Sequence, residues 1–311
     1  MAKKSPHPGG SGVPSRSLVA DSPWARISQE VTQSWELRKD LIAKIGRRLR
    51  GKVITYMTSF ISEDAMIHDR DAEMIENILS VEHSDGGRVL LILNSGGGSG
   101  LAAERIVNVC RAYSDGDFEV VVPHMAKSAA TVICFGASRI HMSRTAELGP
   151  VDPQLKYIDD AGQEQWISAA EYVRSYDTLM EKAISGQAKR LETIIQQLAR
   201  YDARYIEKLR SAQDLSGNIS VKLLKSGMMS RYSDDNIRER ISEFLIQQHT
   251  GSHSRMVSMA EAKACGLKIS EIELRSELWG WIWELYIRAD WALSSARCIK
   301  ILESDCSALR I

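Results

Sequence analysis

Between residues 53 and 142, short apolar segments alternate with helical ones, and this alternation limits the possible folds more than any other feature of the chain. The segment Val-Leu-Leu-Ile-Leu at residues 89–93 is apolar throughout, as is typical of a strand buried on both faces. Strands that alternate with helices form parallel crossover units. The sequence therefore predicts an α/β fold on a parallel sheet. Strands are expected at residues 53–57, 89–93, 119–122 and 139–142, and helices at residues 71–81, 101–113 and 128–135.

A glycine-rich turn, Asn-Ser-Gly-Gly-Gly-Ser-Gly at residues 94–100, follows the second of these strands and precedes a helix. Glycine permits positive φ and a close approach of backbone to ligand, so the amides of such a turn can point outward together. The turn could bind a phosphate or stabilise the oxyanion of an acyl-transfer reaction. It matches neither a dinucleotide-binding fingerprint nor a P-loop, because neither the acidic partner nor the Lys-Ser/Thr pair follows it.

A second strand-to-helix junction, Ala-Lys-Ser-Ala-Ala-Thr at residues 126–131, places Ser128 at the start of an apolar helix. A serine at this position is either a helix N-cap or a nucleophile. The carboxyl ends of neighbouring parallel strands face one crevice, so the two junctions should converge there. We therefore expect Ser128 to lie beside the glycine-rich turn.

These two motifs, followed by Glu-Leu-Gly-Pro-Val-Asp-Pro-Gln at residues 147–154, resemble those of the serine dehydrogenase proteinase family. That family belongs to the wider group of Clp protease and signal peptide peptidase A folds. The resemblance covers residues 52–269, approximately. It implies an α/β fold of the Clp/crotonase type, a spiral of strand-strand-helix units, with additional helices at both ends.

The resemblance also implies roles for individual residues. Ser128 would be the nucleophile, and the oxyanion would be bound by Gly97, Gly98 and the amide of Ala129. Many relatives have glycine where this chain has Ala130, which is a small change on a helix and does not argue against activity.

The base that activates the serine is a separate question, because a serine is inert until its proton is removed. The segment around His253 resembles the Ser-His-Gly segment of the family, so His253 is the first candidate, with Asp152 as the carboxylate that orients it. Signal peptide peptidases use a lysine instead, and Lys182 and Lys189 lie at a suitable distance along the chain. Lys127 adjoins Ser128, but neighbouring residues at a helix start point in different directions.

Two classes of function follow from these expectations. The first is a serine endopeptidase in which Ser128 attacks a peptide carbonyl and the turn formed by Gly96–Gly98 stabilises the oxyanion. The second is a non-catalytic or acyl-handling protein of the Clp/crotonase fold that serves as an oligomeric scaffold or binds a partner.

The remaining segments differ in composition from the central one. Residues 1–24 are rich in proline and glycine and are expected to form a flexible tail, and residues 25–51 an amphipathic basic helix. Residues 52–270 form the expected peptidase-like domain. Residues 271–311 form a Trp-rich, helical C-terminal extension, which should pack on the core or on a second subunit.

The amino-acid composition limits which partners the protein can bind and in which cellular compartment it is expected. Forty Lys and Arg balance forty Asp and Glu, so no global basic field indicates nucleic acid. The five cysteines show no metal-ligand spacing, and chains of this size with few cysteines are usually reduced and cytoplasmic. Neither a metal nor a cofactor is expected. No apolar run approaches the roughly 18–20 residues of a membrane span, although the basic helix leaves a peripheral membrane contact open. A peptide or protein substrate and a homo-oligomer are the expected partners.

Overall fold

The computed structural model describes residues 26–27, 34–60, 62–82, 86–158, 162–185, 191–245, 255–295 and 298–311. The predicted tail at residues 1–24 lies outside these ranges.

The centre of the molecule is a seven-stranded sheet in the order β10-β5-β3-β2-β1-β11-β12. Strands β1, β2, β3, β5 and β10 run parallel, and β11 and β12 are antiparallel additions beside β1. The predicted strands of the parallel part are confirmed to within a few residues. The bounds are Lys52–Thr58 for β1, Val89–Asn94 for β2, Phe118–Val122 for β3, Arg139–Met142 for β5, Ile269–Glu271 for β10, Lys300–Glu303 for β11 and Ala308–Arg310 for β12.

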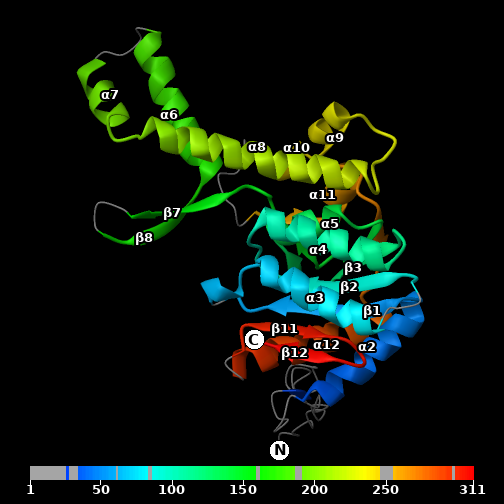
Figure 1. Cartoon of the computed structure of the whole chain (residues 1–311). Helices are drawn as coiled ribbons and strands as arrows, with labels where there is room; N and C mark the ends of the chain where they lie inside the picture. Colours follow the sequence, from blue (N-terminus) through cyan, green and yellow to red (C-terminus); the bar gives the residue numbers. More distant parts are fainter. Residues whose placement is uncertain are drawn as a thin grey trace, which may run out of the picture.

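Helices cover both faces of this sheet (Figure 1), which explains the unbroken apolar run of β2. Val89, Leu91 and Leu93 pack on one face against α3, α4 and α5. Leu90 and Ile92 pack on the other face against α2 and α12. The bounds are Trp35–Leu49 for α2, Asp69–Glu82 for α3, Gly100–Tyr113 for α4, Ala129–Phe135 for α5 and Glu277–Ser295 for α12.

Short strands after the main strands form a second layer and make the chain a spiral. Strand β4 (Met125–Ala126) follows β3, β6 (Glu147–Leu148) follows β5, and both pair with each other in parallel. Isolated parallel bridges join Ser95 to Ala126 and Ile67 to Gly98, which extends this layer across the first two units. The repeat of strand, short strand and helix confirms the predicted fold.

The C-terminal residues complete the main sheet. Helix α12 packs against the sheet with Trp279 buried, and the other aromatic residues of its face are partly buried around it. After α12 the chain returns as the hairpin β11–β12, which sequence analysis did not predict, and β11 pairs with β1 so that Lys300 lies opposite Thr58. The C-terminal extension predicted at residues 271–311 therefore consists of a helix and a β-hairpin. Both belong to the layers around the central sheet.

An arm extends from the layered body (Figure 1). It consists of a hairpin of the antiparallel strands β7 and β8, and of helices α6, α7 and the beginning of α8. Helices α9 to α11 and strand β9 return to the body. The bounds are Gln154–Ile158 for β7, Glu164–Ser168 for β8, Ala169–Ile184 for α6, Leu191–Leu198 for α7, Ala203–Lys225 for α8, Asp234–Arg240 for α9, Ser242–Leu245 for α10, Val257–Ser258 for β9 and Met259–Ala264 for α11.

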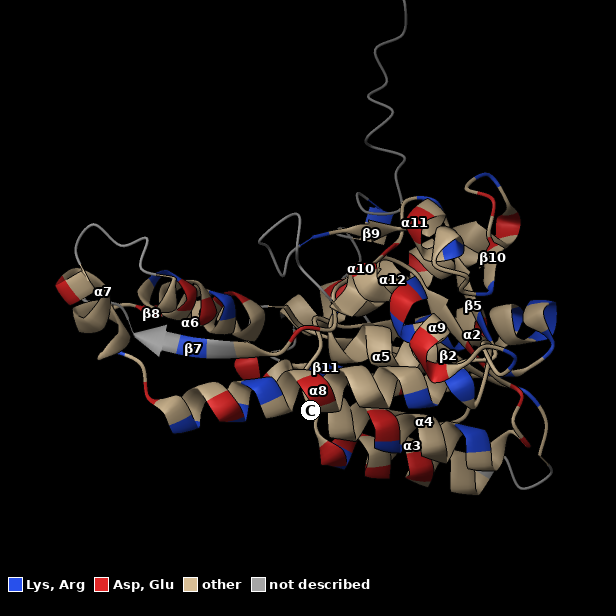
Figure 2. Ribbon diagram, turned by 90° about the horizontal axis from the view of Figure 1, so that it is seen from above, with Lys and Arg blue, Asp and Glu red and all other residues tan. Residues whose placement is uncertain are grey.

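Charged residues of both signs are distributed over the helices (Figure 2). The second half of α2 carries exposed basic side chains at Lys44, Arg47 and Arg48, whereas its apolar residues Leu41 and Ile45 are buried. Of the helices in the described part of the chain, none is both long and apolar enough to span a bilayer.

Candidate active site

The glycine-rich turn joins the end of β2 to the start of α4, and two of its positions require glycine. Gly97 and Gly98 have φ values of +113° and +150°. A Cβ on Gly98 would lie 2.3 Å from the Ile67 nitrogen, and a Cβ on Gly97 would lie 2.6 Å from the Ser128 Cβ. Because no side chain fits at these distances, the turn can pack directly against two other segments.

Ser128 precedes α5 in a conformation that is rare for residues other than glycine. Its φ is 49° and its ψ is −119°, and its amide donates to the Pro150 carbonyl at 3.1 Å. Ser128 occupies the N-cap position, yet its side chain makes no capping hydrogen bond. A conformation of this kind costs on the order of 1–3 kcal/mol and persists only where the surrounding structure enforces it. The hydroxyl of Ser128 therefore does not cap the helix, and its strained backbone is enforced by contacts outside α5.

Two backbone amides beside Ser128 have no hydrogen-bond partner within the described residues, namely those of Gly98 and Ala129. The amide of Gly97, by contrast, donates to Ser95 Oγ at 3.2 Å. A Cβ built on Gly97 would lie 3.2 Å from the Ala129 nitrogen, so the turn and the start of α5 adjoin. Unpaired amides next to a serine hydroxyl are suited to bind an oxyanion formed there.

Two cavities meet at Ser128 and Gly98. One has a volume of about 310 Å³, and the other of about 220 Å³. The larger is lined in part by exposed apolar side chains from the β1–α3 connection and from β8, namely Phe60, Met66 and Trp166. The smaller is lined by apolar side chains of α4, α5 and α8, namely Leu101, Val132, Leu215 and Ile219. The serine thus borders two adjoining cavities whose linings are rich in apolar side chains.

The structure adds two supporting residues that sequence analysis missed. The amide of Ile67 donates to the Gly97 carbonyl and the carbonyl of Ile67 accepts from the Ser99 amide, both at 2.8 Å. The hydroxyl of Ser95, as noted, accepts from the turn. Ser95 lies within the motif and could have been suspected, whereas no local pattern connects residue 67 with a turn about thirty positions later.

Of the candidate bases, the structure describes the positions of two lysines, Lys182 and Lys127. His253 and Lys189 lie outside the described residues. Lys182 is exposed in the last turn of α6, in the arm. Lys127 forms an ion pair with Glu147 at 2.5 Å, with its Nζ also near two carbonyl oxygens, so its ammonium is already engaged.

Asp152 is buried, with a relative exposure of 3%. Burial raises the pKa of its carboxyl from 3.8 to about 6, while the Ser168 hydroxyl and the Ala170 amide hydrogen bond to the carboxylate and oppose this shift. Asp152 lines a third cavity, of about 240 Å³, together with Arg238. Its known partners are therefore at the start of α6, and a contact with His253 stays a prediction.

We expect Asp152→Asn to stabilise the protein above pH 6. The folded state binds the Asp152 proton more tightly than the unfolded state, so the contribution of this carboxyl to the free energy of unfolding falls as the pH rises from about 4 to 6. Asparagine keeps the acceptor but carries no charge. The variant should gain about 1–3 kcal/mol at pH 7.5 and nothing at pH 3.5, measured by urea denaturation. An equal pH dependence in both proteins would contradict the raised pKa.

His141 and His124, which lie close to the strands of the site, both contact other side chains of the core. The imidazole of His141 lies 2.6 Å from the Glu119 carboxylate. The ring of His124 stacks on Tyr286 at a centroid distance of 5.3 Å, and burial lowers its pKa. Among the described residues, no group of three or more His, Cys, Asp or Glu side chains is placed to hold a metal ion.

A strand-strand-helix spiral with a serine and unpaired amides at one junction is the architecture of a serine hydrolase of the Clp type. The chain belongs to the family of ClpP-like SDH-type serine proteinases, whose family model matches residues 23–286. The resemblance inferred from the motifs is thereby confirmed.

Similarity to individual proteins is more limited. The uncharacterized protein MJ0137 of Methanocaldococcus jannaschii is 45% identical over 65 residues, 21% of this chain and 22% of that protein. The uncharacterized protein MJ1495 of the same organism is 34% identical over 110 residues, 35% and 37% of the two chains. The chain thus matches well under half the length of these relatives. ClpP1 from Listeria monocytogenes superposes with a TM-score of 0.40 at 13% identity, over 76% of this chain and 97% of that chain.

Proposed function

We propose that the protein is a serine peptidase in which Ser128 attacks the carbonyl carbon of a peptide bond. The observation that carries this proposal is the backbone of Ser128, which at φ 49° holds a hydroxyl without a partner among the described residues where two cavities meet. Strained residues of this kind cluster at functional sites. Membership of a serine proteinase family supports the class of reaction.

In the proposed reaction, the Ser128 oxygen bonds to the carbonyl carbon while its proton passes to the base. The carbonyl oxygen becomes an oxyanion, for which the amides of Gly98 and Ala129, in and beside the Gly96–Gly98 turn, are the proposed donors. The base then protonates the leaving amine and the peptide bond breaks. Water hydrolyses the acyl-enzyme by the same steps. One such donor contributes about 2.7–4 kcal/mol to transition-state stabilisation.

The cavities indicate the kind of peptide that would fit. Both are lined largely by apolar side chains, Phe60 and Trp166 in one and Leu101 and Ile219 in the other. Apolar side chains gain about 25 cal/mol per Å² of surface removed from water. We propose substrates with apolar residues on both sides of the scissile bond.

A fluorophosphonate probe tests the proposal. The purified protein is labelled, digested and analysed by mass spectrometry, and hydrolysis of casein and of acyl-coenzyme A thioesters is measured in parallel. We expect one adduct, on Ser128, and hydrolysis of casein. Thioester hydrolysis without proteolysis would favour the acyl-handling alternative, and no adduct on Ser128 would exclude an activated serine.

For the base, we propose His253 oriented by Asp152, with Lys182 or Lys189 as the alternative. If His253 is the base, kcat/KM should fall below about pH 6.5 as the imidazole becomes charged, and His253→Ala should lower kcat by at least about 10²-fold. The measurement is the pH profile of peptide hydrolysis, with Lys182→Ala and Lys189→Ala measured alongside as tests of the alternative base. Substantial activity in His253→Ala, with loss in a lysine variant, would move the role to that lysine.

We also propose that the chain self-associates. Trp279 is buried and its neighbours pack on the sheet, so the Trp-rich helix gives less support than the sequence suggested. Support comes instead from the arm, where Ile184, Leu191 and Ile195 are exposed. Exposed apolar side chains of this kind are often found at interfaces between subunits.

A further inference from the structure

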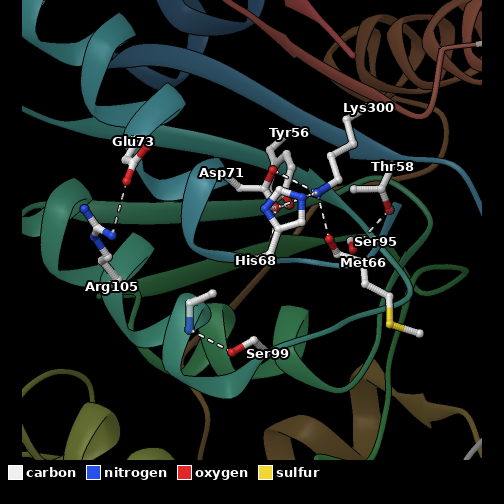
Figure 3. A network of polar contacts seen from close by, with 11 residues as sticks. Tyr56, Thr58, Met66, His68, Asp71, Glu73, Ser95, Ser99, Arg105 and Lys300 are labelled. Atoms are coloured by element: carbon white, nitrogen blue, oxygen red, sulfur yellow. Dashed lines mark hydrogen bonds and ion pairs between the residues drawn. The ribbon is translucent and has the colours of Figure 1, made fainter. Parts of the chain in front are cut away.

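A buried polar network joins the C-terminal hairpin to the segment that follows β1 (Figure 3). Its centre is Lys300 of β11, whose Nζ lies 2.9 and 2.7 Å from the two carboxylate oxygens of Asp71. The side chains of Lys300 and Asp71 are fully buried. The hydroxyl of Tyr56 donates to the same carboxylate at 2.6 Å. Lys300 lies beyond the residues that the family model matches.

The ammonium also reaches the backbone that borders the glycine-rich turn. Lys300 Nζ donates to the Met66 carbonyl at 2.7 Å and lies 3.0 Å from Nε2 of His68. The amide of His68 donates to the Asp71 carboxylate at 2.8 Å. Both neighbours of Ile67 are therefore fixed by the Lys300–Asp71 pair.

The backbone of Ile67 pairs with the glycine-rich turn. Its amide and carbonyl bond to the residues on either side of Gly98, as described above, so Ile67 and Gly98 pair like two strands. The Ile67 backbone occupies the place where a Gly98 side chain would lie. Gly98 thus packs against Ile67, and the residues on both sides of Ile67 bond to the Lys300–Asp71 pair.

Fold stability alone gives a weak reason for this arrangement. The desolvation of two buried charges cancels much of their attraction, so apolar residues in the same place often stabilise a fold equally well. A buried ion pair does, however, fix the geometry of the groups around it when all its hydrogen bonds are satisfied. The contacts of Lys300 are of this kind.

We propose that Lys300 is a positioning residue for the oxyanion-binding turn, so that the C-terminal hairpin takes part in catalysis through Met66, Ile67 and Gly98. The proposal rests on the proposed function. In this proposal β11 positions the Gly98 amide, which donates to the oxyanion in the transition state. We therefore expect little effect on substrate binding.

The test compares Lys300→Met with Arg38→Met by amide hydrogen exchange and by steady-state kinetics. Arg38 of α2 forms a fully buried ion pair with Glu303 of the same strand, at 2.7 Å, on the face that is opposite to Lys300. This control removes a comparable buried charge next to β11 without touching the turn. In case Lys300→Met does not fold, the double variant Lys300→Met/Asp71→Asn removes both charges.

With Lys300→Met or the double variant, we expect the amides of Ile67 and Ser99 to lose at least about tenfold of their protection relative to the amide of Leu91 in β2. In the same variants kcat should fall about 10- to 100-fold, with KM within about threefold, because the donor is displaced and not removed. Arg38→Met should change neither the two amides nor kcat.

Unchanged protection of Ile67 and Ser99 would overturn the proposal, as would lost protection with unchanged kcat. Failure of both Lys300 variants to fold, while Arg38→Met folds, would also overturn it, because the network would then serve the fold as a whole. If the wild-type protein has no hydrolytic activity, the proposed function fails, and the exchange data still decide whether Lys300 holds the turn.

Discussion

Replacing Ser128 by glycine is expected to abolish peptide hydrolysis and, at the same time, to raise the free energy of unfolding by about 1 kcal/mol. At φ 49° and ψ −119° the serine is strained by about 1–3 kcal/mol, which glycine relieves. The greater chain entropy of glycine in the unfolded state offsets about 0.4–1 kcal/mol of this gain. Loss of the nucleophile should lower kcat by at least about 10⁴-fold.

Ser128→Ala separates the two effects. Alanine removes the hydroxyl but keeps the strain, and the hydroxyl makes no capping bond, so stability should change by less than about 0.5 kcal/mol. Both variants should lose fluorophosphonate labelling. The measurements are urea denaturation and turnover of an apolar peptide.

Ser138→Ala is the matched control for the serine variants. The Ser138 hydroxyl donates to the Phe118 carbonyl at 3.0 Å, away from the two cavities, so its removal should cost about 1 kcal/mol and leave labelling intact. Hydrolysis by either Ser128 variant at the wild-type rate would exclude Ser128 as the nucleophile. A glycine variant less stable than the alanine variant would contradict the strain argument.

Gly98→Ala should have the second largest effect. The new Cβ would meet the Ile67 nitrogen at 2.3 Å and the Ile67 oxygen at 2.5 Å, and these are backbone atoms that cannot rotate away. The turn must shift and the unpaired Gly98 amide must move with it. We expect kcat to fall about 10²–10³-fold and the free energy of unfolding to fall by about 3 kcal/mol or more.

Gly280→Ala, in α12, controls for the chemical change from glycine to alanine. A Cβ there meets nothing within 4 Å, so the variant should be more stable by up to about 1 kcal/mol and fully active. The measurements are kcat and denaturation midpoints of both variants. A Gly98→Ala protein as active as Gly280→Ala would show that the Gly98 amide is not a required donor.

The layered core and the two strand-to-helix junctions could be predicted from the amino-acid sequence. Period and apolarity are local properties, so the run of β2 and the helices beside it could be identified without any long-range contact. The motifs around Gly98 and Ser128 lie directly after strands, and parallel strands bring such junctions together. The family followed from the same motifs.

The contacts that support the site, by contrast, could not be predicted from the sequence. The pairing of β11 with β1, the contact of Ile67 with Gly98 and the bond between Lys300 and Asp71, 229 residues apart, depend on which distant segments meet. The positive φ of Ser128 is likewise enforced from outside, since serine has no preference for it. Local sequence patterns carry no information about such contacts. The contacts stabilise the fold only after distant segments have met, which requires the intervening chain to close into loops.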